Sequence, residues 1–194
     1  MAELNENNSL TDIANSALVL IKEIIITSIE EDSDVAKAIR QMITPAIYLV
    51  QNSLEWNELI VSTTLDLAER DIVDGFYKYN KPIGFIKLYT ENKNTVWKIE
   101  GEHLYVANNN TKVKYFKKNI EPATWSDELK ECVILKLASK LATYISNDYK
   151  LGGQLEERYD LFQKKTIASQ KAKRNGNVKN ARRVRSWNGD RQFR

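Results

Sequence analysis

The sequence predicts an α+β fold in which antiparallel helices form a bundle, a small antiparallel β-meander is inserted, and an extended arm follows at the C-terminus. Three observations support this prediction. Apolar residues recur at helical spacing in the first and last thirds of the chain, and alternating patterns bounded by turn residues fill the middle. The composition also becomes strongly basic near residue 173. The order helices, strands, helices favours an α+β fold over an alternating βαβ sheet.

The first helix is predicted from apolar residues that recur every three or four positions between Leu10 and Ile25. Ser9 or Thr11 supplies its start, because hydroxyl side chains satisfy the free backbone N–H groups of a first turn. The acidic segment 27–34 interrupts the apolar stripe. We therefore expect a solvated loop there.

A second helix is predicted after an N-cap at Asp32 or Ser33, with an apolar pattern that continues to Trp56. Pro45 falls inside that pattern. Proline removes a backbone donor and clashes with the preceding turn, so a kink or a break is predicted near Ile43-Thr44.

Alternating or β-branched segments predict strands in the middle of the chain, at 59–67, 85–89, 96–99, 104–106 and 112–115. Gly101 between two of them can adopt the positive φ of a tight hairpin. Asn108-Asn109-Asn110 predicts a second turn. Together the strands predict one small meander with one solvated face.

Helices are predicted again towards the C-terminus. Pro122 and Ser126 mark the start of a helix with a wide apolar face that extends to Ile145. Gly152-Gly153 is interpreted as part of a loop that terminates this helix. A last helix is predicted from about Gln154 through Phe162, after which the apolar pattern fades.

The charge of the chain is divided sharply between two regions. Residues 163–194 hold eleven Lys or Arg and one acid, whereas the other 162 residues hold 18 bases and 25 acids. We therefore predict an acidic folded domain, residues 1–172, and a basic arm, residues 173–194, which is disordered in isolation and becomes ordered on a partner. The basic residues of the C-terminal region are Lys164, Lys165, Lys171, Lys173, Arg174, Lys179, Arg182, Arg183, Arg185, Arg191 and Arg194.

Residue counts argue against most kinds of catalytic site. The chain has one cysteine, Cys132, and one histidine, His103, which excludes an internal disulfide, a cysteine-rich zinc module and any site that needs two imidazoles. His103 is expected to be exposed beside the hairpin turn, and Cys132 to be a buried apolar side chain. Gly152-Gly153 lacks the following Lys-Ser/Thr of a phosphate-binding loop. We therefore expect no catalytic, cofactor or metal site, and no enzyme.

Two other groups of residues have a functional and a structural interpretation. The acids Glu30, Glu31, Asp32 and Asp34 could bind a hard cation, but they lack calcium-loop spacing, and a solvated linker before a helix explains them more simply. The tryptophans Trp56, Trp97 and Trp125 could stack on nucleobases. Packing at the ends of helices is the favoured interpretation for Trp56 and Trp125.

The chain is expected to be a soluble intracellular protein. Its longest uninterrupted apolar run, Ala17 to Ile21, is far shorter than the roughly 20 residues of a membrane span. The polar, acidic N-terminus also differs from a secretory signal.

One stretch resembles a known family. Residues 17–41, ALVLIKEIIITSIEEDSDVAKAIRQ, are similar to the opening of the tail tubular protein A family, the head-to-tail adaptors of short-tailed bacteriophages. Shorter matches follow in the family's order over roughly residues 10–173. They are Trp56-Asn57, Glu100-Gly101, Tyr115, Pro122, Trp125 and Leu135 to Leu141.

The resemblance implies a structural role in the virion, at the tail or neck, after synthesis in the cytoplasm of the host bacterium. Such adaptors form a ring, usually of twelve copies, between the portal protein and the tail nozzle protein, and genomic DNA passes through the lumen without specific binding. We expect the basic arm to dock on acidic crevices of the portal through charge-assisted hydrogen bonds. Its expected contact residues are Lys173, Arg174, Lys179, Arg182, Arg183, Arg185, Trp187, Arg191, Phe193 and Arg194.

Two other interpretations of the basic arm remain open. The chain could be a nucleic-acid-binding module whose arm contacts phosphates with salt-dependent affinity. The arm could also be a solubilising tail without a specific partner, although eleven bases against one acid exceed what solubility requires.

Overall fold

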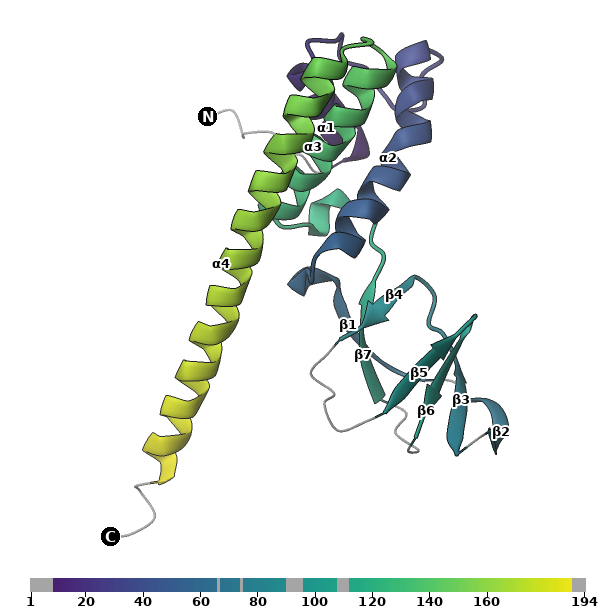
Figure 1. Cartoon of the computed structure of the whole chain (residues 1–194), viewed down its shortest axis with the longest axis vertical. Coiled ribbons are helices and arrows are strands. Elements are labelled where there is room, and N and C mark those ends of the chain that lie inside the picture. Colours follow the sequence, from purple (N-terminus) through teal and green to yellow (C-terminus); the bar gives the residue numbers. More distant parts are fainter. Residues whose placement is uncertain (1–8, 66, 74, 90–95, 108–111, 190–194) are drawn as a thin grey trace.

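The protein has a mixed α+β fold in which helices and strands occupy separate regions (Figure 1). The computed structural model describes the backbone of residues 9–189 except 66, 74, 90–95 and 108–111, and it describes side chains over the same residues except 67–73 and 170–189. We call α1, α2, α3 and residues 149–169 of α4 the helical body, and β1–β7 the strand lobe. The helices are α1 (Leu10–Leu20), α2 (Asp34–Ser53), α3 (Asp127–Tyr144) and α4 (Tyr149–Gly189), with short 3-10 helices at Asn57–Leu59 and Pro122–Thr124.

Serine side chains cap three of these helices, in agreement with the sequence. Ser9, Ser33 and Ser126 each accept a hydrogen bond from a backbone N–H three residues later, at N···O distances of 3.1, 3.1 and 3.3 Å. Asp12 completes a capping box on the backbone N–H of Ser9. The predicted starts of the first three long helices are therefore confirmed.

The break predicted near Ile43-Thr44 is wrong, because α2 continues through Pro45 without interruption. The proline ring is exposed, whereas Ile43, Ala46 and Ile47 beside it are buried. Burial of these side chains offsets the missing backbone hydrogen bond, so packing overrides the local preference of proline.

The loop predicted at Gly152-Gly153 is also wrong, because both glycines lie inside α4. The helix begins earlier, at Tyr149, where the Asp148 side chain accepts a hydrogen bond from the backbone N–H of Leu151 at 2.8 Å. Gly152 is a point of close helix packing. A Cβ atom there would lie 2.6 Å from Thr143 Oγ1 and 3.1 Å from the Ser139 carbonyl oxygen of α3.

The last helix does not fade after Phe162 but extends to Gly189, so residues 173–189 have a helical backbone rather than an extended one. This segment contains no proline, and its Lys, Arg and Ala residues are good helix formers, although it also holds four Asn and two Gly. In Figure 1 this half of α4 projects away from the helical body. Residues 190–194 of the predicted arm lie outside the described residues.

The strands form two antiparallel sheets rather than one meander, with the orders β1-β7-β4 and β2-β3-β6-β5. The segment predicted as one strand at 59–67 is divided between β1 and β2, and β3 was not predicted. The hairpin at Gly101 is confirmed, with φ of 51°. The second predicted turn, at 108–110, lies outside the described residues. The strands are β1 (Ile60–Thr64), β2 (Leu67–Val73), β3 (Phe76–Asn80), β4 (Phe85–Leu88), β5 (Trp97–Glu100), β6 (His103–Val106) and β7 (Lys112–Lys117).

Strand β7 contributes side chains to two separate cores. Val113 and Tyr115 belong to the core of the strand lobe, whereas Phe116 belongs to the core of the helical body. A second link is polar: the side chain of Gln51 in α2 is buried and exchanges two hydrogen bonds with the backbone of Asn119, just after β7. The strand lobe is therefore attached to the helices near the C-terminal end of β7.

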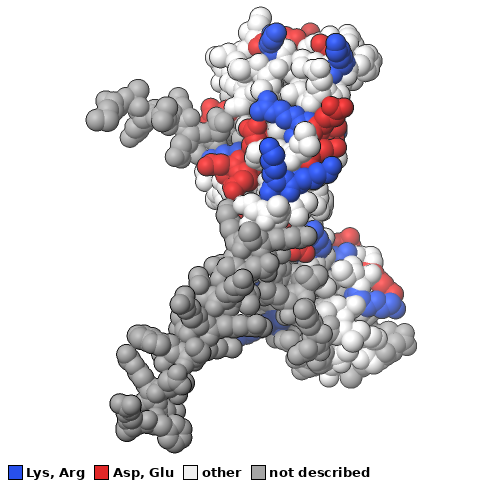
Figure 2. All heavy atoms as spheres, turned by 60° about the vertical axis from the view of Figure 1, so that its left-hand side comes forward, with Lys and Arg blue, Asp and Glu red and all other residues white. Residues whose placement is uncertain are grey.

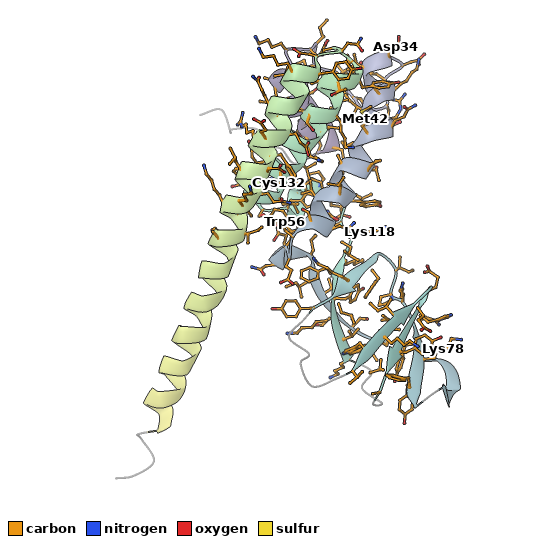
Figure 3. The ribbon with its side chains drawn as sticks, in the orientation of Figure 1. Asp34, Met42, Trp56, Lys78, Lys118 and Cys132 are labelled. Atoms are coloured by element: carbon orange, nitrogen blue, oxygen red, sulfur yellow. The ribbon has the colours of Figure 1, made fainter. Side chains whose placement is uncertain are left out.

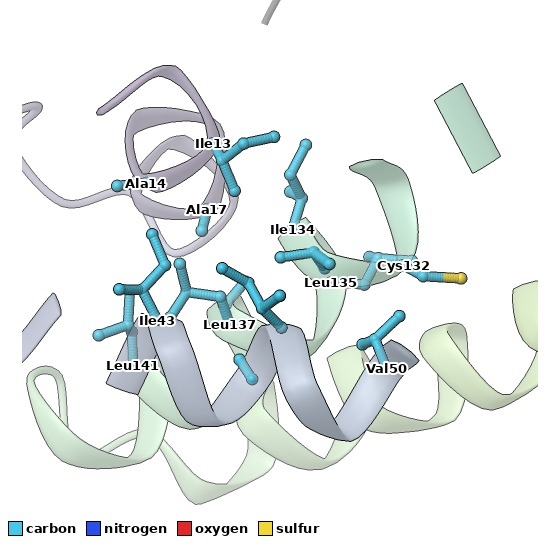
Figure 4. Packing of buried hydrophobic residues seen from close by; sticks show 14 of the residues in the cluster. Ile13, Ala14, Ala17, Ile43, Val50, Cys132, Ile134, Leu135, Leu137 and Leu141 are labelled. Atoms are coloured by element: carbon cyan, nitrogen blue, oxygen red, sulfur yellow. The ribbon is translucent and has the colours of Figure 1, made fainter. Parts of the chain in front are cut away.

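Helix α3 lies at the centre of the helical body and packs against α1, α2 and α4. Figure 4 shows apolar side chains of α1 and α2 converging on it, including Ile13 near Ile134 and Leu135. Because α3 is apolar on most of its circumference, it requires neighbours on several sides.

The close packing at Gly152 yields a test of this architecture. We expect Gly152→Ala to lower the free energy of unfolding by about 1–3 kcal/mol, because the new methyl group clashes with α3. The matched control is Gly153→Ala, where a Cβ would have no neighbour within 4 Å. It should raise stability by about 0.5–1 kcal/mol through helix propensity. Urea unfolding measures both, and equal effects would contradict the close approach.

Candidate interaction surfaces

The first half of α4 is firmly anchored on the helical body. Leu155, Tyr159 and Thr166 are buried at intervals of four and seven residues. The Tyr159 hydroxyl lies 3.3 Å from Ser53 Oγ of α2 and accepts a hydrogen bond from Gln163 at 3.0 Å. This anchoring extends to Thr166, so the helix is fixed before the basic arm begins.

A partly buried ion pair strengthens the same contact. Lys136 of α3 pairs with Glu156 of α4, and Ser139 donates a hydrogen bond to the same carboxylate at 2.9 Å. Burial raises the pKa of Glu156, but the hydrogen bonds from Lys136 and Ser139 outweigh burial and hold that pKa below its usual value. The carboxylate therefore stays charged at neutral pH and links the two helices.

The predicted docking residues all belong to the far end of the chain. Lys173, Arg174, Lys179, Arg182, Arg183, Arg185 and Trp187 lie on the helical backbone of α4. Their side chains, and residues Arg191, Phe193 and Arg194, lie outside the described parts of the structure. The helix places these positions along one rod that starts at the helical body (Figure 1).

The surface of the helical body beside α4 carries both positive and negative side chains, unlike the basic arm. Blue and red side chains are interspersed there (Figure 2), and they include an ion pair between Arg158 and Glu131 at 3.3 Å. Charge on this face is therefore balanced locally. The excess of positive charge belongs to residues 163–194.

A groove of about 970 Å³ lies between α2, α3 and the first turns of α4. Met42 contributes from α2, on the side that faces α3 and α4 (Figure 3). Tyr144 and Tyr149 also line it and are 59% and 72% exposed. Sequence reasoning missed this groove because it placed a loop at the glycines that line one wall.

The acidic segment before α2 is a structured loop, and its hydrogen bonds account for its residues. Glu31 accepts hydrogen bonds from the backbone and hydroxyl of Thr27 at 2.9 and 2.6 Å, and from Ser33 at 2.7 Å. These bonds lower its pKa to about 2. Lys37 forms an ion pair with Asp32 at 2.8 Å. Within the described residues, no group of three or more His, Cys, Asp or Glu could hold a metal ion.

The other candidate residues mostly serve packing. Trp56 and Trp125 are buried, which rules out base stacking by either, whereas Trp97 is half-buried in the strand lobe. Cys132 is buried as predicted, and burial, followed by the nearby Glu131 and Glu128, raises its pKa to about 12. Such a thiol is a poor nucleophile at neutral pH.

The exposure predicted for His103 is wrong. The side chain is half-buried on β6, and its Nδ1 atom is buried without a hydrogen-bond partner among the described residues. Pairing of β6 with both β3 and β5 covers this position.

None of the helices in the described residues is both long and apolar enough to cross a membrane. The chain matches no protein-family model, and none of the curated proteins is significantly similar to it. Support for a function therefore comes from the chain's own residues and from the resemblance given above.

The depressed pKa of Glu31 gives a prediction for acid stability. A carboxyl with a lowered folded-state pKa stabilises the protein above its ordinary pKa of 4.5, and this stabilisation is lost as pH falls towards about 2. We expect Glu31→Gln to be less stable than the native chain at pH 6, and this difference to shrink between pH 4.5 and 2. Thermal unfolding across this pH range measures the difference. Glu30→Gln is the matched control and should not reproduce this pH dependence, since the Glu30 side chain accepts none of these bonds.

Proposed function

We propose that the chain is a phage virion structural protein, a ring-forming head-to-tail adaptor that joins the portal protein to the tail nozzle protein. The observation that carries the proposal is the continuity of α4. Its first half is buried on the helical body, and its second half carries most of the chain's excess positive charge. One continuous helix thus connects a folded body to a segment suited to an acidic partner.

Charge and geometry favour the portal as that partner. Arginine side chains form paired, charge-assisted hydrogen bonds with carboxylates. Five of the seven basic residues between 173 and 191 are arginines, namely Arg174, Arg182, Arg183, Arg185 and Arg191. An isolated helix of this composition is marginal in water, so a partner surface would stabilise it. In a ring of twelve copies, weak contacts from individual arms reinforce one another.

The proposal extends to assembly and location. The ring would sit at the tail or neck of the virion, after synthesis in the host bacterial cytoplasm, and genomic DNA would pass through its lumen without specific binding. Arms lining the lumen would hold DNA and slow its passage, so docking on the portal is the favoured placement. The role requires no catalytic residue and no cofactor.

The basic arm also supports a second candidate function, a nucleic-acid-binding module. Binding through phosphates weakens steeply as salt concentration rises. Titration of duplex DNA at increasing salt separates the two functions. Tight DNA binding that persists near physiological salt, without affinity for portal rings, would favour the second.

The docking role predicts the effect of removing charge at matched positions. We expect Arg182→Gln/Arg183→Gln to weaken attachment to portal rings strongly, because two charge-assisted contacts per copy are lost and the loss is multiplied around the ring. The control is Lys164→Gln/Lys165→Gln, which removes the same charge from two exposed positions on the anchored half of α4. Co-sedimentation with portal rings measures attachment.

Deletion of residues 173–194 provides a second check. It should abolish attachment but leave thermal unfolding of the body nearly unchanged, because the anchoring residues Leu155, Tyr159 and Thr166 precede the deletion. Full attachment of the truncated protein would contradict the docking role of the arm.

A further inference from the structure

The loop between α1 and α2 presents two isoleucines to solvent. Ile24 and Ile25 are 82% and 60% exposed, and Val19 in the last turn of α1 is 63% exposed. Single exposed apolar residues are common, but several within a short stretch mark a surface suited to a partner. We call Val19, Ile24 and Ile25 the apolar knob.

The backbone that carries the apolar knob is held in place from both sides. The Asn15 side chain exchanges two hydrogen bonds of 2.9 Å with the backbone of Ile26, whose own side chain is buried. At the other end, Glu23 donates its backbone N–H to Leu18 at 3.0 Å and accepts a hydrogen bond from Ser146 of the α3–α4 connection at 3.0 Å. The isoleucines are therefore preorganised for contact, which reduces the entropy cost of binding.

The groove between α2, α3 and α4 offers a concave surface of sufficient size. Met42, exposed Pro45, Tyr144 and Tyr149 supply apolar and aromatic surface to a concavity of about 970 Å³. That volume accommodates several aliphatic side chains. A pair of isoleucines thus fits a site of this size and lining.

Helix α1 and the groove lie on opposite sides of α3, but the loop that carries the apolar knob reaches one end of the groove, because Glu23 accepts a hydrogen bond from Ser146 and the adjacent Asn147 lines the groove. Ile134 of α3 lies near Ile13 of α1 (Figure 4), whereas Lys136, two residues later and about 200° around the helix, lines the groove. In Figure 1, α4 lies in front of α3 and α1 lies behind it. Within one copy, Ile24 and Ile25 are 82% and 60% exposed and do not line the groove, so the knob of a copy does not fill its own groove.

The charges of the two surfaces are also complementary. Residues 21–34, which carry the two isoleucines, contain one base and five acids. Lys37 pairs with Asp32 and Asp34, which still leaves this loop with a net negative charge. The charged residues that line the groove are Lys136, Lys140 and Glu156. Because Lys136 is already paired with Glu156, Lys140 gives the groove a net positive charge.

We infer that Ile24 and Ile25 of one copy of this chain seat in the groove of the next copy, between Met42, Pro45 and Tyr149. This inference rests on the proposed function and names the surfaces that would build its ring. Contact between two different surfaces is heterologous, so every copy keeps one knob and one groove for its two neighbours, and the chain of contacts closes if the rotation permits. Cyclic symmetry then directs all the cationic halves of α4 the same way.

Cysteine cross-linking tests the contact directly. The native Cys132 is buried, so introduced thiols at Ile25→Cys and Pro45→Cys are selectively reactive towards a short bismaleimide. We expect a mixture of the two single variants, at high protein concentration and on portal rings, to give cross-linked dimers and no larger species. The double variant should give a ladder of multimers. The matched control replaces Ile25→Cys with Ile83→Cys, an exposed isoleucine of the strand lobe (93%), and should give no cross-link to Pro45→Cys.

The outcomes separate this inference from the proposed function. Rings visible on portals by electron microscopy without a ladder would overturn the knob-and-groove contact and leave the adaptor role standing. A ladder without any attachment to portals would support the contact and contradict the adaptor role. Dimers formed by Ile25→Cys alone would indicate a two-fold contact and also overturn the inference.

Independently, Ile25→Glu should weaken self-association about tenfold or more, because its charge would be buried in the groove.

Discussion

The burial of α3 is the constraint on which the rest of the structure depends. Its buried side chains face in nearly every direction, including Leu129, Val133, Leu135 and Leu141, so the helix must be enclosed by neighbours. Helices α1 and α2 cover part of it, and α4 completes the enclosure at the close approach of Gly152. The position of α4, and hence the direction of the basic arm, follows from this packing.

The same packing divides α4 into two parts with different physical properties. Up to Thr166 the helix is stabilised by apolar burial and by the Lys136–Glu156 ion pair, neither of which depends on a partner. From Lys173 onward, eight of the 22 residues are Lys or Arg and one is acidic, and mutual repulsion makes a lone helix of this composition marginal. A body that is stable by itself and an arm that gains stability from a partner form the physical basis of the proposed adaptor.

Much of the fold could be predicted from the sequence because its signals are local. Serine caps and three- to four-residue periodicity predicted the starts of the first three long helices, and Gly101 predicted the hairpin between β5 and β6. The errors occurred where contacts between distant residues decide the outcome. Pro45 stays within a helix because its neighbours are buried, and Gly152 lies inside α4 because α3 passes close to it.

The candidate surfaces also differ in whether the sequence alone could predict them. The basic arm is defined by its excess of Lys and Arg, which can be counted directly in the sequence. The groove requires residues from three helices separated by about a hundred positions, from Gln41 to Glu156, so no local pattern indicates it. The exposure of Ile24 and Ile25 also escaped sequence reasoning, because their spacing continues the apolar stripe of α1 although the helix ends at Leu20.

Hydrogen exchange of the α4 backbone, free and on portal rings, tests the central claim most directly. The account predicts that amides near Leu155 and Tyr159 are protected in both states. Amides of residues 173–189 should exchange rapidly in the free protein and slow markedly when portal rings are added. Equal exchange of residues 173–189 in the two states, under conditions where the protein is attached, would contradict the claim that this half of α4 is the docking element.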